Sequence, residues 1–149
     1  MKPILLLTIF VFLLASCGNN LKKSIDASYA DGTPAKISYL EEKNGVTDTV
    51  KKEEFYDNGK KKVEGSLKNN KRDGTWTYWH KNGKVWSQGT FKDGLSHGTF
   101  NIFHEDGSKY MQSCYKNGKP DGVWTFFDKN VKKKEVYFKN DSIIKQIDF

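Results

Sequence analysis

Hydrophobic and polar positions recur with a 24-residue period across residues 55–139. Four sets of equivalent positions keep this spacing: Gly59, Gly83 and Gly107; Gly74, Gly98 and Gly122; Trp76, Phe100 and Trp124; and Phe55, Trp79, Phe103 and Phe127. Within each unit, two short runs alternate apolar and polar residues, and Asn-Gly or Asp-Gly pairs separate them. Alternation with a period of two is typical of half-buried strands, and these pairs are typical of hairpin turns. The pattern predicts one β-hairpin per unit, in three full units and a shortened fourth.

The alternation also predicts which side chains share a face. First strands are expected at about 61–68, 85–92, 109–116 and 132–139, and second strands at about 75–79, 99–103 and 123–127. Trp76 and Tyr78 then point to one face, and Thr75 and Thr77 point to the other. In the first strands, a small or modest residue precedes a large one by two positions (Gly65, Gly89, Ser113 and Val136 before Leu67, Phe91, Tyr115 and Phe138). A neighbouring ring is therefore expected to lie across each first strand.

The turns are assigned from their glycines. Asn58-Gly59 and its equivalents are expected to form type I′ turns, which need positive φ at both central residues. A second set of turns is expected to end at Asp73-Gly74, His97-Gly98 and Asp121-Gly122.

The flanking residues complete one predicted domain, residues 29–149. Residues 29–54 are interpreted as a degenerate leading repeat, in which Lys52 takes the position of Trp76, and residues 140–149 as a C-terminal capping strand. From Phe55 to Phe149 there are 17 aromatic residues against 11 Leu, Ile and Val, so stacked rings are expected to supply most of the burial. A lone hairpin is marginally stable, so the units must stack. The predicted fold class is all-β: an elongated single-layer antiparallel meander of stacked β-hairpin repeats.

The units resemble MORN repeats, and more closely the variant MORN repeats of the YwqK-like group. The resemblance covers about residues 55–139, in units such as FHEDGSKYMQSCYKNGKPDGVWTF. It implies hairpins stacked into an elongated sheet, and an association with membrane phospholipids and protein partners. The YwqK-like group is often labelled as an antitoxin component. Val131 in place of a turn glycine, and Ser113 in place of a strand glycine, depart from the pattern.

The first residues are typical of a secretory signal. A lysine is followed by an apolar run from Ile4 to Leu14, which is shorter than the ~20 residues that span a bilayer. Leu14-Ala15-Ser16-Cys17 resembles the bacterial lipobox, which implies that residues 1–16 are cleaved and that Cys17 is acylated. Residues 17–28 are then a lipidated N-terminus and a polar tether. The alternative is an ordinary signal peptide whose cleavage site lies near a cysteine.

The lipobox predicts a protein of the cell envelope, held on a membrane by lipid. Gly18 follows the cysteine in place of Asp, a pattern that resembles outer-membrane lipoproteins, so the outer membrane is favoured over the inner one in a Gram-negative cell. The formal net charge of +7 falls to +6 without residues 1–16. Because the lysines recur with the repeat, most are expected on solvated faces and turns. A basic face that binds anionic lipid or glycan is the alternative.

Candidate reactive residues are few. His80 and His104 occupy equivalent positions, but no Cys or acid accompanies both of them and structural zinc needs four ligands, so we expect an exposed pair and no metal site. His97 is assigned to a turn. Cys114 would be the one cysteine left after lipidation of Cys17, and no base is placed near it, so we expect a free, partly exposed thiol. No catalytic residue and no cofactor is therefore predicted.

These patterns predict a membrane-anchored lipoprotein that acts as a non-enzymatic binding or scaffold module through its repeat surface. The expected partners are the membrane, through the lipid anchor, and a protein, with anionic lipid or envelope glycan as further possibilities. An exported protein is not expected to meet nucleic acid. The alternative function is an antitoxin or immunity-type protein that neutralises a partner toxin. The face that binds is not assigned.

Overall fold

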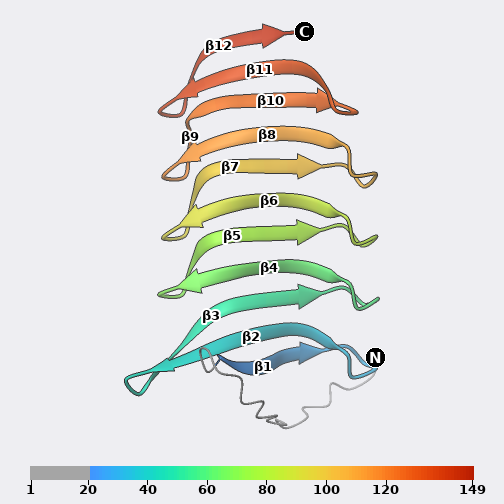
Figure 1. Ribbon diagram of the computed structural model, residues 1–149, viewed down its shortest axis with the longest axis vertical. Coiled ribbons are helices and arrows are strands. Elements are labelled where there is room, and N and C mark those ends of the chain that lie inside the picture. The colour runs from blue at the N-terminus through green and yellow to red at the C-terminus, as the bar shows by residue number, and fades with distance from the viewer. Residues whose placement is uncertain (1–20) are drawn as a thin grey trace.

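A computed structural model describes residues 21–149 as one open twelve-stranded antiparallel sheet (Figure 1). Successive strands are neighbours in space, so the predicted single-layer meander is confirmed. Residues 1–20, with the predicted signal peptide and Cys17, lie outside the described residues. Among the residues described, no helix could cross a membrane. The strands are β1 (Leu21–Ser28), β2 (Pro34–Lys43), β3 (Val46–Phe55), β4 (Lys61–Lys68), β5 (Lys71–Trp79), β6 (Val85–Lys92), β7 (Leu95–Phe103), β8 (Lys109–Lys116), β9 (Lys119–Pro120), β10 (Gly122–Asp128), β11 (Val131–Lys139) and β12 (Ser142–Asp148).

The turns lie at two opposite sides of the sheet (Figure 1). One side has three-residue loops and, between β10 and β11, the two-residue turn Lys129-Asn130, and the other side has two-residue turns. At Asn58-Gly59 only the glycine has positive φ, 76°, so the predicted type I′ turn is wrong there. The Gly59 amide donates to the Tyr56 carbonyl at 2.9 Å and the Tyr56 amide donates to the Lys60 carbonyl at 2.8 Å, which defines a three-residue loop. Two-residue turns with positive φ at both positions occur elsewhere: Asn44-Gly45, Asn69-Asn70, Asp93-Gly94, Asn117-Gly118, Lys129-Asn130 and Asn140-Asp141.

Asp73-Gly74 and His97-Gly98 lie inside β5 and β7, so their assignment to turns is also wrong. The register between β4 and β5 changes between the pairs Gly65–Trp76 and Leu67–Arg72, which leaves residues 73–75 opposite one residue of β4. Gly74 has a φ of 87° in this bulge. A bulge glycine and a turn glycine need the same backbone conformation, so the sequence signal does not separate them.

Residues 21–28, assigned to a polar tether, form β1 and pair antiparallel with β2. The register places Ile25 opposite Ile37, and the Ser38 hydroxyl donates to the Asp26 carboxylate at 2.5 Å. Leu21 and Ile25 remain 45% and 56% exposed, because β1 is an edge strand. Main-chain hydrogen bonds hold this edge strand, and it buries few side chains, so its sequence shows little hydrophobic alternation. The tether interpretation is therefore wrong for these eight residues.

One face of the sheet carries the predicted aromatic column. Neighbouring rings lie with centroids 4.8–6.4 Å apart, a spacing typical of favourable aromatic pairs. The rings belong, in order across the strands, to Trp76, Phe91, Phe100, Tyr115, Trp124 and Phe138. The indole N–H groups of Trp76 and Trp124 donate to the carbonyls of Ser66 and Cys114, at 2.9 and 3.0 Å. The column supplies much of the burial in a sheet that has no second layer.

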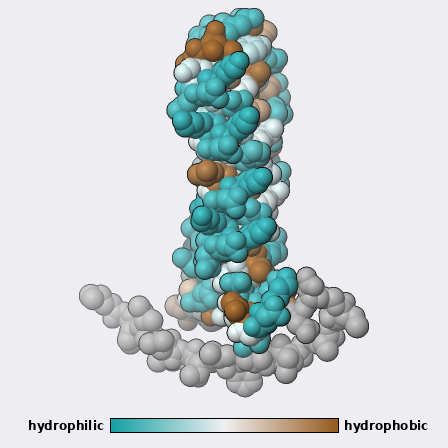
Figure 2. Space-filling view, turned by 90° about the vertical axis from the view of Figure 1, so that its left-hand side faces the viewer, coloured by the Kyte–Doolittle hydropathy of each residue, from teal (hydrophilic) through white to brown (hydrophobic). Residues whose placement is uncertain are grey.

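The opposite face carries a polar row through the middle of the sheet. Side chains that are direct neighbours in the register contribute it, one from each of the strands β4 to β8, β10 and β11: Glu64, Thr77, Gln88, Asn101, Gln112, Thr125 and Glu135. The sheet thus has one aromatic face and one polar face, as its alternation predicts. Figure 2, which views the side with the two-residue turns, shows a mostly hydrophilic surface with separate hydrophobic spots.

Candidate functional site

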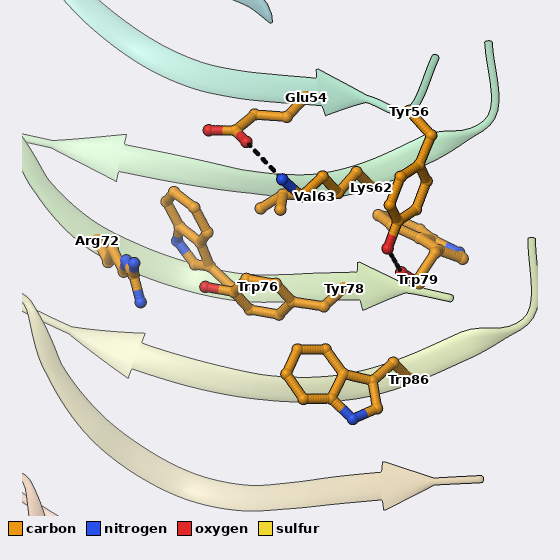
Figure 3. Close-up of a pocket in the computed structure, with 9 residues that line it drawn as sticks. All are labelled: Glu54, Tyr56, Lys62, Val63, Arg72, Trp76, Tyr78, Trp79 and Trp86. Carbon is orange, nitrogen blue, oxygen red and sulfur yellow. Dashed lines mark hydrogen bonds and ion pairs between the residues drawn. The ribbon is translucent and has the colours of Figure 1, made fainter. Parts of the chain in front are cut away.

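A pocket of about 350 Å³ opens over strands β3 to β6 (Figure 3). Five of the residues that line it are aromatic: one in the turn after β3, three on β5 and one on β6. Val63 and three charged side chains complete the lining. The lining is Glu54, Tyr56, Lys62, Val63, Arg72, Trp76, Tyr78, Trp79 and Trp86. A concave, largely aromatic site with a few polar groups is the usual form of a ligand site.

A β-bulge places Trp86 in this pocket. The register between β5 and β6 passes from Tyr78–Ser87 to Trp79–Val85, so Trp86 has no partner in the ladder. Bulges re-aim side chains, and Trp86 is 48% exposed, in edge contact with Tyr78 at a centroid distance of 6.1 Å. The equivalent bulged residue of the next unit is Tyr110 on β8, which is 43% exposed and lies outside the pocket.

Arg72 lies at the other end of the pocket, where it is held by two aromatic rings. Its guanidinium carbon is 4.7 Å from the centroid of Trp76 and 5.2 Å from that of Phe91. Cation–π contacts fix the side chain without using its hydrogen-bond donors. Within residues 21–149, Arg72 takes part in no salt bridge. The guanidinium is therefore positioned, exposed and available to an anion.

The remaining charges in the pocket are already compensated. The Glu54 carboxylate lies 3.9 Å from the Lys62 ammonium and 3.8 Å from that of Lys36 (Figure 3). Tyr56 donates its hydroxyl proton to the Trp79 carbonyl at 2.7 Å, which links neighbouring turns. These contacts leave Arg72 as the pocket's one uncompensated charge among the described residues.

Five side chains form an ionic cluster on the polar face: Tyr39, Lys51, Glu53, Lys61 and Glu64. The buried Glu53 carboxylate accepts from the Tyr39 hydroxyl at 2.8 Å and lies 3.0 and 3.1 Å from the ammonium groups of Lys51 and Lys61. Burial acts to raise the pKa of Glu53, but the hydrogen bonds from Lys51, Tyr39 and Lys61 outweigh it, so the pKa lies below its ordinary value. Since its members satisfy one another, the cluster stabilises the sheet.

The histidines have separate environments. The Nε2 atom of His80 lies 3.1 Å from the Phe103 carbonyl, so His80 connects neighbouring turns and is not merely a solvated side chain. His104 packs on Tyr110, with a centroid distance of 5.1 Å. His97 lies in β7, not in a turn, and its buried Nδ1 atom has no hydrogen-bond partner within the described chain.

The half-buried Cys114 is a free thiol on β8, 3.9 Å from the Thr99 hydroxyl. Across residues 21–149, no three His, Cys, Asp or Glu side chains are grouped in a way that could hold a metal ion. The predicted lipidation site, Cys17, lies outside the described residues.

The pocket was missed by sequence reasoning, although one signal was available. Arg72 is the only arginine among the 25 Lys and Arg residues of the chain, and it stands one place C-terminal to Lys71 at the start of β5. Ser96 and Pro120 occupy its position in the next two units, so the repeat does not require it. A residue whose type is otherwise absent from the chain, and which does not recur with the repeat, is a candidate for a functional role.

The geometry is that of a β-hairpin repeat protein with an aromatic column on one face and an open pocket. Three tandem stretches, residues 49–69, 72–93 and 96–117, match the model of the MORN repeat variant. Over these three stretches the chain is similar to MORN-variant repeats, in agreement with the predicted resemblance. Such repeats are generally associated with binding and scaffold roles. No curated protein matches the chain.

Proposed function

We propose that the protein is a lipid-anchored lipoprotein of the bacterial cell envelope that binds a partner, without catalysis, through the pocket over β3–β6. The observation that carries this proposal is Arg72. The aromatic ladder and the turns use most of the distinctive side chains of the repeats, whereas this guanidinium is held in place and engages no acid among the described residues. A positioned charge without an acidic partner, beside exposed aromatic rings, favours the binding of a partner.

The anchor is inferred from the lipobox. Acyl chains contribute about 0.8 kcal/mol per buried methylene, and stable anchoring needs more than one chain. The described sheet begins at Leu21, four positions after Cys17, so an acylated Cys17 would hold β1 close to the bilayer. The outer membrane is the favoured location in a Gram-negative cell.

The anchor is tested by metabolic labelling with palmitate. The wild type is expected to incorporate label and to sediment with membranes, and Cys17→Ala is expected to do neither. Cys114→Ala is the matched control, since it removes the other cysteine and should keep both properties. Absence of label in the wild type would refute the anchor.

The binding role is tested by cross-linking in the native envelope. The full-length wild type is compared with Arg72→Gln and Trp86→Ala, and Tyr110→Ala serves as the control at the equivalent bulge of the next unit. A partner that is lost in both pocket variants and kept in the control supports the proposal. If all three variants retain the same partners, the pocket is not the contact surface.

The antitoxin alternative rests on the YwqK-like resemblance alone. The same cross-linking distinguishes it, because a neutraliser would capture one toxin, and deletion of its gene would be toxic to the cell. Deletion without toxicity would remove this alternative.

A further inference from the structure

The lining of the pocket over β3–β6 carries one net positive charge, which matches a ligand with a single negative charge. Among the lining residues, Glu54 pairs with Lys62, so the one net positive charge of the lining is on Arg72, which has no acidic partner in residues 21–149. A phosphate monoester carries about −1.5 to −2 charges near neutral pH and would be compensated only in part. A carboxylate carries one charge, and its two oxygens fit the fork of a guanidinium.

The polar tips beside Arg72 favour a ligand with hydroxyl groups. Tyr78 directs its hydroxyl along β5 toward the end of the pocket where Trp76 and Arg72 lie (Figure 3). No hydrogen bond within residues 21–149 engages that hydroxyl or the indole N–H of Trp86, whereas the buried Trp76 donates to a carbonyl. Tyr78 is half-buried and Trp86 is exposed, so both polar groups are open to donate to oxygen atoms of a ligand.

The rings themselves favour a ligand with an apolar flat side. Trp86 is 48% exposed and meets Tyr78 edge to face, with an interplanar angle of 82°. A pyranose ring combines a C–H face, which packs on such rings, with hydroxyl groups at its rim. This match between apolar surface and polar edge is the same one that makes Tyr and Trp effective in recognition.

An extended peptide fits this place poorly. The pocket lies in the middle of the sheet, where β4 pairs with β3 and β5, and β5 pairs with β4 and β6. The main-chain donors and acceptors of these strands are used in those ladders, so a peptide cannot add as a further strand. It would have side-chain contacts only.

We propose that the pocket binds an acidic sugar unit of a glycan, with its carboxylate on the Arg72 guanidinium and its ring against Trp86 and Tyr78. The inference rests on the proposed binding role of this face and names its ligand class. It does not depend on the lipid anchor.

The test uses full-length protein and three acidic oligosaccharides, which contain glucuronate, N-acetylneuraminate or N-acetylmuramate. Each is paired with its carboxyl-reduced form, and binding is measured by calorimetry. The wild type is expected to bind at least one acidic form and to bind its reduced form about tenfold more weakly, because a charge-assisted hydrogen bond is lost. Arg72→Gln and Arg72→Lys should each lose about tenfold for the acidic form, since lysine keeps the charge and lacks the fork.

Trp86→Ala tests the ring contact, with Tyr110→Ala as its matched control, and Lys116→Gln controls for the loss of one positive charge. Trp86→Ala should weaken binding of acidic and reduced forms alike, whereas both controls should bind as the wild type does. Circular dichroism confirms that each variant is folded.

The proposal is overturned if no acidic sugar binds, if the reduced forms bind equally well, or if Arg72→Gln binds like the wild type. Tighter Arg72-dependent binding of an acidic peptide, or of vesicles with 30% phosphatidylglycerol, would also overturn it and identify a different ligand. Failure of the glycan with cross-linking that still depends on Arg72 leaves the binding role intact. Loss of both refutes the role as well.

Discussion

The indole ring of Trp76 lies flat across the backbone of Gly65 on the neighbouring strand. A β-carbon added at Gly65 would stand 2.1 Å from a ring carbon, far inside van der Waals contact. Phe100 covers Gly89 in the same way, also at 2.1 Å. The two glycines are therefore required by the rings above them and not by a turn.

This contact predicts the effect of Gly65→Ala. The added methyl group must displace the buried ring of Trp76, and overpacking of this kind costs about 1–3 kcal/mol. Urea denaturation should show the loss as a lower midpoint. Ser66→Ala is the control, since Ser66 is exposed on the next residue; equal midpoints for the two variants would contradict the packing.

The ionic cluster predicts acid sensitivity. Because the folded pKa of Glu53 is depressed, its contribution to the free energy of unfolding is fully present above the ordinary glutamate pKa of about 4.3 and is lost as the pH falls through the lower folded pKa. Glu53→Gln should therefore be less stable than the wild type at neutral pH, by roughly 1–3 kcal/mol. The difference should shrink in acid, where the wild-type carboxyl is protonated.

Thermal denaturation at pH 7 and at pH 3 measures this difference for Glu53→Gln. The control is Glu105→Gln, which changes an exposed turn residue. A stability gap that stays constant between the two pH values would contradict the assigned role of Glu53.

The turn between β10 and β11 predicts a stabilising change. Lys129 and Asn130 have φ values of 47° and 71°, and a lysine at positive φ is unfavourable, whereas asparagine tolerates it. Asn44, Asn69 and Asn117 already occupy the equivalent place in other turns. Lys129→Asn should raise stability by up to about 1 kcal/mol, measured as a higher urea midpoint. Lys116→Asn, in a strand, should bring no such gain.

The repeat predicts most of the sheet, because its glycines and aromatic residues are required by contacts between neighbouring strands. The two faces follow from a period of two, and a ring across each first strand follows from its small residues. The register identifies that ring as Trp76 for Gly65. Strand β1 does not follow, since an edge strand that buries little carries no clear alternation. The error at Asp73-Gly74 has a similar cause, because turns and bulges select the same glycine.

The pocket could not be predicted from the repeat, because it depends on departures from it. Trp86 enters the pocket through a register change that alternation does not encode, and Arg72 is bracketed by rings from two strands. Three-dimensional register was needed to bring these side chains together. Only the isolated occurrence of arginine in a lysine-rich chain pointed to the place.

Because the strands follow one another in order, the length of the sheet depends on the number of hairpins. Neighbouring strands are about 4.8 Å apart, so each hairpin adds about 10 Å of length. Arg72 is on β5, the fifth strand from the N-terminal edge of the sheet. If that end is tethered through Cys17, inserting one hairpin between β1 and β2 would raise the pocket by about 10 Å, and inserting one after β11 would leave its height unchanged. Repeat number would then set how far from the bilayer a ligand is held.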